Sequence, residues 1–81
     1  MSMFHFHLHE CGNSTIDPDG RDLPDVETAI IIAIEAARDI MAEEVRMGKL
    51  CLSCHIAVEN SRREQVAHIS FSEALVVTGR N

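Results

Sequence analysis

The feature that most constrains this chain is a strict alternation of apolar residues and histidines near its start. From Phe4 to His9 the sequence reads Phe-His-Phe-His-Leu-His. A period of two places successive side chains on opposite faces of a strand, whereas a helix needs a period near 3.6. The pattern therefore predicts a strand over residues 3–10, with an apolar face toward the core and a histidine face directed away from it.

A long amphipathic helix is predicted over residues 25–48. Asp25 is a favourable N-cap residue, and Gly48 is typical of the position just beyond a helix C-terminus. One broad stripe of the helix is apolar and predicts that the helix covers a sheet. It comprises Val26, Ile30, Ala33, Ile34, Ala37, Ile40 and Met41, with Ala29 and Ala36 along its edge. Ile31 and Ile32 interrupt the polar side, so we predict that they contact a partner.

Two further strands are predicted in the second half of the chain, over residues 50–59 and 65–71, because apolar and polar residues again alternate there. Residues 11–24 are rich in Gly, Asn, Ser, Asp and Pro and predict a surface loop. Ser72–Leu75 predicts a single helical turn, and residues 76–81 predict a loose tail. The whole chain, 1–81, is expected to form one α+β domain in βαββ order, with the helix packed on one face of a three-stranded sheet.

Composition and charge exclude several classes of protein. The net charge of −6, from 13 acidic and 7 basic side chains, opposes binding to nucleic acid. The apolar run Ala29–Ile34 is far shorter than the roughly 20 residues that span a bilayer, and no signal peptide is evident at the start. We therefore expect a cytoplasmic protein that interacts with neither nucleic acid nor membrane.

Four short segments resemble a family of small uncharacterised bacterial proteins over nearly the whole chain. They are His7-Leu8-His9-Glu10, Asp19-Gly20, Leu23-Pro24-Asp25 and Phe71-x-x-Ala74-Leu75. The family's function is unknown, so the resemblance implies no activity. This sequence differs from the family pattern at His5 and His7, where an aromatic residue and an acid are usual, and at Ile30 and Ile32, where charge is usual.

The five histidines are the first candidate site. On the predicted strands His5, His7, His9, His55 and His68 all fall on outward positions, so they are expected to line one surface. Neighbouring imidazoles on such a face can bind zinc, nickel or copper. The same face, or an edge strand beside it, can instead pair with a second copy of the chain.

The three cysteines, Cys11, Cys51 and Cys54, are expected to remain free in a reducing compartment. Cys51-Leu52-Ser53-Cys54-His55 matches a haem-attachment pattern, but the required export route is not evident. On a regular strand Cys51 and Cys54 point to opposite faces, which argues against a shared zinc ion or a disulfide. We therefore expect a buried apolar Cys54 and an incidental surface thiol at Cys51.

The sequence as a whole favours a small non-catalytic binding or interaction module that acts as a homodimer, with no catalytic residue and no cofactor. Transition-metal binding by the histidine face is the alternative, and an enzyme or ligand carrier with a pocket at a dimer seam is a more distant one. Protonation of all five histidines takes the net charge from −6 to −1. Association is accordingly expected to change near pH 6.

Overall fold

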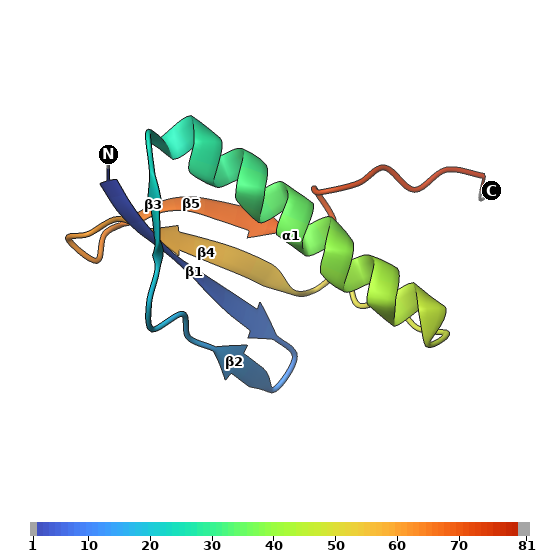
Figure 1. The fold of residues 1–81 in the computed structure, drawn as a ribbon. Coiled ribbons are helices and arrows are strands. Elements are labelled where there is room, and N and C mark those ends of the chain that lie inside the picture. The colour runs from blue at the N-terminus through green and yellow to red at the C-terminus, as the bar shows by residue number, and fades with distance from the viewer. Residues whose placement is uncertain (1, 80–81) are drawn as a thin grey trace.

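The computed structural model describes residues 2–79, which form one helix and five strands (Figure 1). In chain order these are β1 (Ser2–Glu10), β2 (Asn13–Thr15), β3 (Arg21–Leu23), α1 (Val26–Arg46), β4 (His55–Glu59) and β5 (Gln65–Ser70). Residues 1, 80 and 81, which include the end of the predicted 76–81 tail, lie outside the described residues. Among the described residues, no helix is both long and apolar enough to cross a bilayer.

The strands form an antiparallel sheet in the order β2-β1-β4-β5, with β3 also paired to β1. The predicted α+β class is confirmed, but the prediction of three strands in βαββ order is wrong. Residues 11–24, expected to be a loop, contribute β2 and β3, which run back along β1 with the pairs Leu8↔Thr15 and Phe4↔Arg21. Between β2 and β3, residues 16–20 do not take part in the regular strand pairing with β1 and form a bulge.

Helix α1 covers one face of the sheet (Figure 1). It begins at the predicted N-cap, where the Asp25 carboxylate accepts a hydrogen bond of 2.8 Å from the Thr28 amide. It ends at Arg46, and Gly48 then adopts a left-handed φ of 87°, as expected for a residue beyond a helix end. The predicted helix bounds are therefore close to those observed.

The core face of α1 is a ridge of small residues. Ala29, Ala33 and Ala37, spaced four apart, are completely buried, and Met41 continues the ridge. The predicted stripe was centred too far toward the isoleucines: Val26 is exposed, and Ala29, placed at the stripe's edge, lies at its centre. Alanines at the centre let the helix backbone approach the sheet closely, and the larger side chains then pack to either side.

The chain between α1 and β4 differs from the prediction. Residues 50–54 were expected to open a strand, but β4 begins at His55, and both Leu50 and Leu52 are 40% exposed. The chain has to reverse direction after the helix, and this loop makes the reversal. Beyond β5, Phe71 is fully buried and the Ala74 amide donates to the Ser70 carbonyl, so the expected turn at Ser72–Leu75 is present as a hydrogen-bonded turn rather than a helix.

Candidate functional site

The sheet face opposite α1 carries all five histidines. Cross-strand pairing places His7, Ala57 and His68 in one row, and His9 and His55 in the next. The rings of His9 and His55 are stacked with centroids 4.7 Å apart, and those of His55 and His68 are 4.3 Å apart. Three strands therefore contribute to one continuous stack of imidazoles, which we call the histidine stack (His9, His55 and His68).

The stack affects the ionisation of its central member. Burial lowers the pKa of His55 below its ordinary value, and the charges of His68 and His9 lower it further. A proton on His55 would lose solvation and face like charges if either neighbour were also protonated. The neutral imidazole at the centre of the stack is therefore favoured in the folded protein.

His7 lies beside the stack and is held by two neighbours. The Asp17 amide donates to His7 Nδ1 at 3.1 Å, which makes Nδ1 an acceptor and assigns the proton to Nε2. Nε2 then donates to the Glu59 carboxylate at 2.9 Å. A cavity of about 360 Å³ opens next to this pair, lined by His5 and Arg63 among others. The pair resembles a catalytic dyad, but both ring nitrogens are occupied, so His7 has no free nitrogen to act as a base.

The histidines do not converge on a point. Stacked rings present their faces to one another, whereas a metal ion requires ring nitrogens directed at one position. Across residues 2–79 no group of three or more His, Cys, Asp or Glu side chains is arranged to hold a metal ion. Metal binding by His5, His7, His9, His55 and His68 stays a prediction, and its geometry would require the rings to rotate.

The two isoleucines predicted to contact a partner differ in their surroundings. Ile31 is 58% exposed on the outer side of α1. Ile32 is partly buried and packs against the core. Only Ile31 therefore offers an open apolar surface of the kind that the sequence predicted.

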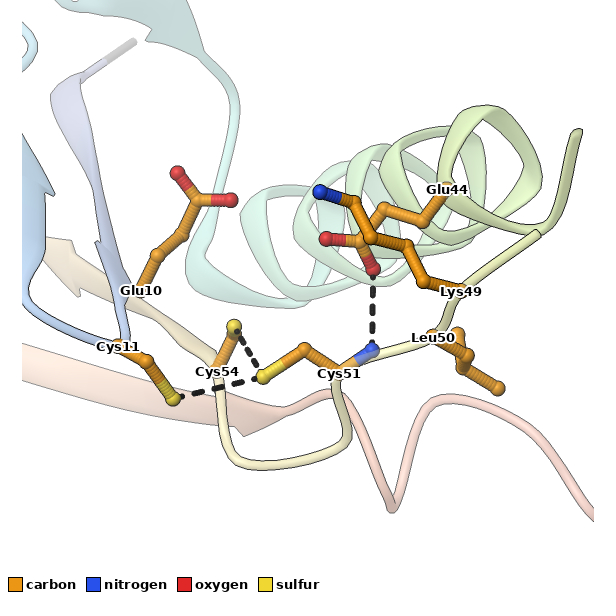
Figure 2. Close-up of a pocket in the computed structure, with 7 residues that line it drawn as sticks. All are labelled: Glu10, Cys11, Glu44, Lys49, Leu50, Cys51 and Cys54. Carbon is orange, nitrogen blue, oxygen red and sulfur yellow. Dashed lines mark hydrogen bonds between the residues drawn. The ribbon is translucent and has the colours of Figure 1, made fainter. Parts of the chain in front are cut away.

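A second site, which the sequence did not predict, lies at the end of the sheet where β1 terminates, beside the loop that leads from α1 to β4. Figure 2 shows the Cys51 sulfur between those of Cys11 and Cys54, at 3.6 Å and 3.1 Å respectively. Cys11 follows β1, and Cys51 and Cys54 lie in the loop before β4. The expectation that Cys51 and Cys54 point to opposite faces is wrong because these residues are not on a strand. We call this group the thiol cluster (Cys11, Cys51 and Cys54).

The three thiols have unequal environments. Hydrogen bonds from the Cys54 thiol, the Ser53 amide and the Cys11 thiol lower the pKa of Cys51. Burial, followed by the hydrogen bond to Cys51, raises the pKa of Cys54 to about 11. The hydrogen bond with Cys51 raises the pKa of Cys11. The cluster therefore favours its negative charge on the central sulfur.

An open cavity of about 260 Å³ adjoins the thiol cluster (Figure 2). Its charged lining residues are Glu10, Glu44 and Lys49. Glu44 also fixes the loop, because its carboxylate accepts a hydrogen bond from the Cys51 amide at 3.3 Å. The cluster is thus accessible from solvent, next to groups of both charges.

Fold and surface together define a small α+β domain with one covered and one open sheet face. The chain belongs to the DUF6894 family, a domain of unknown function, whose model matches residues 3–72. The predicted membership in a family of unknown function is therefore confirmed. No curated protein and no solved structure matches the chain.

The two sites differ in how readily the sequence indicates them. The histidine stack follows from the alternation in β1 and the register of its neighbours. The Cys-x-x-Cys spacing was the available signal for the thiol cluster, but the alternation of Leu50 and Leu52 favoured a strand and concealed it. Nothing in the sequence indicates that Cys11 joins the pair, because that contact joins residues forty positions apart.

Proposed function

We propose that this protein is a non-catalytic interaction module that acts as a homodimer, paired through the outer edge of β5. The observation that carries the proposal is the composition of that edge. β5 reads Gln-Val-Ala-His-Ile-Ser, without proline and without a side chain that is charged at neutral pH when histidine is neutral. β5 is the last strand in the order β2-β1-β4-β5, so among residues 2–79 no strand pairs with its outer edge.

The opposite edge of the sheet supports this proposal by contrast. It is formed by two strands of three residues each, separated by the bulged segment 16–20. That segment and β3 carry Pro18 and charged side chains at Asp17, Asp19, Arg21 and Asp22. Short strands, bulges, proline and charge are the features by which proteins prevent pairing at a sheet edge. The edge formed by β2 and β3 is thus protected against pairing, whereas the outer edge of β5 is open over six residues.

A second copy of β5 fits this edge because an antiparallel strand pairs with itself about a twofold axis. Such pairing keeps the histidine stacks of both copies on the same side of a continuous sheet. It also brings the two His68 side chains close together near the axis. Association is expected to change near pH 6, because protonation of all five histidines takes the net charge of each chain from −6 to −1.

The size of the edge sets the expected strength. Six paired residues bury less than the roughly 1,200 Å² typical of stable complexes, so dissociation on dilution is expected. Sedimentation velocity over a range of concentrations should show a monomer–dimer equilibrium at neutral pH. A chain that stays monomeric at the highest concentration contradicts the proposal.

The matched test adds one positive charge to each edge in turn. His68→Lys places a cation in the middle of β5, where each copy would oppose the other, and is expected to abolish the dimer. Ser14→Lys adds the same charge to β2 on the same face of the sheet and should leave the dimer intact. Equal effects of the two substitutions would show that the pairing does not use β5.

A further inference from the structure

We propose that the thiol cluster is a thiol–disulfide exchange site that reacts with low-molecular-weight disulfides, with Cys51 as the attacking thiol and Cys54 as the resolving thiol. This inference is independent of the proposed dimer, since the thiol cluster lies after β1 and in the loop before β4, whereas the dimer would use the outer edge of β5. In this role the chain is a stoichiometric reactant, whose two redox states differ by one disulfide.

The first argument is proximity. The Cys51 and Cys54 sulfurs are 3.1 Å apart and a disulfide bond is about 2.05 Å long, so closure requires a movement of about 1 Å. Both residues lie in the loop that precedes β4, but the Cys54 carbonyl accepts a hydrogen bond of 2.9 Å from the Phe71 amide, next to the His55↔Ser70 pair. Cys51 is outside the strand pairing, so its side of the loop can make this movement without breaking the sheet.

The second argument is access. All three cysteines line the open cavity, but Cys54 is buried with 2% of its surface exposed, whereas Cys51 is partly exposed and Cys11 is exposed. An incoming disulfide therefore reaches Cys51 and Cys11 more readily than Cys54. The lowered pKa of Cys51 increases its thiolate fraction, and the thiolate is the nucleophile in exchange.

The third argument concerns the second step. Once Cys51 carries a mixed disulfide, Cys54 is the nearer of its two sulfur neighbours, at 3.1 Å against 3.6 Å for Cys11. The buried Cys54 thiol already donates its hydrogen bond toward the Cys51 sulfur. Burial, followed by the hydrogen bond to Cys51, raises the pKa of Cys54 and keeps it protonated in the reduced protein, and a mixed disulfide on Cys51 removes the second of these two contributions.

The two steps balance. The Cys51 thiolate attacks one sulfur of a disulfide RSSR, forming the bond Cys51–S–S–R and releasing RS⁻, which takes up a proton from water. Cys54 then gives up its proton and attacks the Cys51 sulfur, forming the Cys51–Cys54 bond and releasing the second RS⁻, which is protonated in turn. The disulfide is reduced to two RSH molecules while the protein dithiol is oxidised.

The cavity indicates which disulfides react best. At about 260 Å³ it is slightly smaller than the roughly 300 Å³ of the smallest typical ligand pockets, so it suits one half of a small disulfide. Two carboxylates, Glu10 and Glu44, face it with a single ammonium from Lys49, and the whole chain carries a charge of −6. Cationic disulfides such as cystamine should therefore react faster than the anionic glutathione disulfide.

The test follows reduced protein mixed with cystamine under anaerobic conditions with a metal chelator. Samples are quenched in acid, and the modified cysteines are located by mass spectrometry. A transient half-cystamine adduct on Cys51 is expected, followed by a Cys51–Cys54 disulfide. Cys51→Ser should reduce the rate of adduct formation on the order of tenfold, to that of an ordinary thiol. Cys11→Ser removes a thiol whose hydrogen bond lowers the pKa of Cys51, so it should slow adduct formation less than Cys51→Ser does and still yield the Cys51–Cys54 disulfide.

Variants of Cys54 isolate the second step. In Cys54→Ser the adduct on Cys51 should persist, and Cys54→Ala repeats the measurement because a serine hydroxyl is less well accommodated at this buried site. Circular dichroism confirms that each variant is folded. The proposal is overturned if all three cysteines react as fast as in urea-unfolded protein, or if the wild type retains a stable adduct. A Cys11–Cys51 disulfide as the main product would overturn the assignment of Cys54.

Discussion

Asp17 should be the residue of the bulged segment 16–20 on which stability depends most. Its carboxylate accepts hydrogen bonds from the backbone amides of Phe6 at 3.1 Å, Gly20 at 3.1 Å and Asp19 at 3.3 Å. The Asp17 amide also donates to His7. One side chain thus fastens the bulge to the middle of β1 and closes the turn that leads into β3.

The expected cost of Asp17→Ala follows from these three contacts. A hydrogen bond to a charged group contributes roughly 1.5–3 kcal/mol, but water can replace the partner fully at the exposed Asp19 amide and in part at the half-buried Gly20 amide, so a loss of about 2–3 kcal/mol is expected. The stability of a chain of this length is roughly 4–12 kcal/mol, which makes this a large share. The midpoint of thermal unfolding should fall by about 10 °C or more.

The pH dependence supplies a second readout for Asp17. Burial tends to raise the pKa of this carboxyl, but the hydrogen bonds from Gly20, Phe6 and Asp19, together with the charge of His5, outweigh it and leave the pKa below the ordinary 3.8. Because the pKa of Asp17 is lower in the folded protein than in the unfolded chain, the ionised carboxylate stabilises the fold above about pH 3.8. This stabilisation is lost as the pH falls through the pKa of Asp17 in the folded protein. The difference between wild type and Asp17→Ala should therefore shrink toward pH 3.

Urea unfolding followed by circular dichroism measures both effects. Asp19→Ala is the matched control, because it removes the same charge from the neighbouring exposed position. It should change the free energy of unfolding by less than about 0.5 kcal/mol. Equal losses of unfolding free energy for Asp17→Ala and Asp19→Ala would refute this prediction, because it attributes the loss to the hydrogen bonds of Asp17 and not to its charge.

Three further predictions concern stability. Gly20→Ala should reduce the free energy of unfolding by about 2–3 kcal/mol and Gly12→Ala by about 1 kcal/mol. Both glycines have a left-handed φ, but only at Gly20 would a Cβ meet the backbone of β1, at 2.9 Å. Equal losses of stability in urea unfolding would contradict this prediction. The wild type should lose stability as the pH falls below about 6.5, because the unfolded state takes up a proton before His55 does in the folded state. His55→Asn should reduce that loss, and an unchanged dependence of the unfolding midpoint on pH would count against the effect of the stack. Ala33→Leu should destabilise by about 2 kcal/mol because the ridge has no room, whereas Ala42→Leu on the exposed side should be nearly neutral in thermal unfolding.

The parts of the fold that the sequence predicted well are those fixed by local interactions. The alternation from Phe4 to His9 gives β1 and its two faces, and Asp25 marks the start of α1 within one residue. β2 and β3 were missed because three-residue strands have too short a pattern to detect and exist through pairing with β1. Their partners lie along the chain in β1, so only the folded register reveals them.

The errors in the core and at the thiol cluster share a cause, which is reliance on hydrophobicity. A helical wheel weighted by hydrophobicity points toward the isoleucines, but close contact with the sheet selects the smallest side chains, such as Ala33. Likewise, Leu50 and Leu52 appear strand-like by hydrophobicity although each is 40% exposed in a loop. At both places the geometry of the backbone, and not the polarity of the side chains, determines which residues are buried.

The difference between the two sheet edges has a consequence for assembly. A chain with two open edges would add further copies at both ends and grow into a filament. In the proposed dimer, the edge formed by β2, β3 and the segment 16–20 would terminate the sheet at each end. Growth would stop at two copies. Removing the features that protect this edge, for example by shortening the bulge at residues 16–20 and replacing Pro18, would allow further copies to add and the small domain to polymerise.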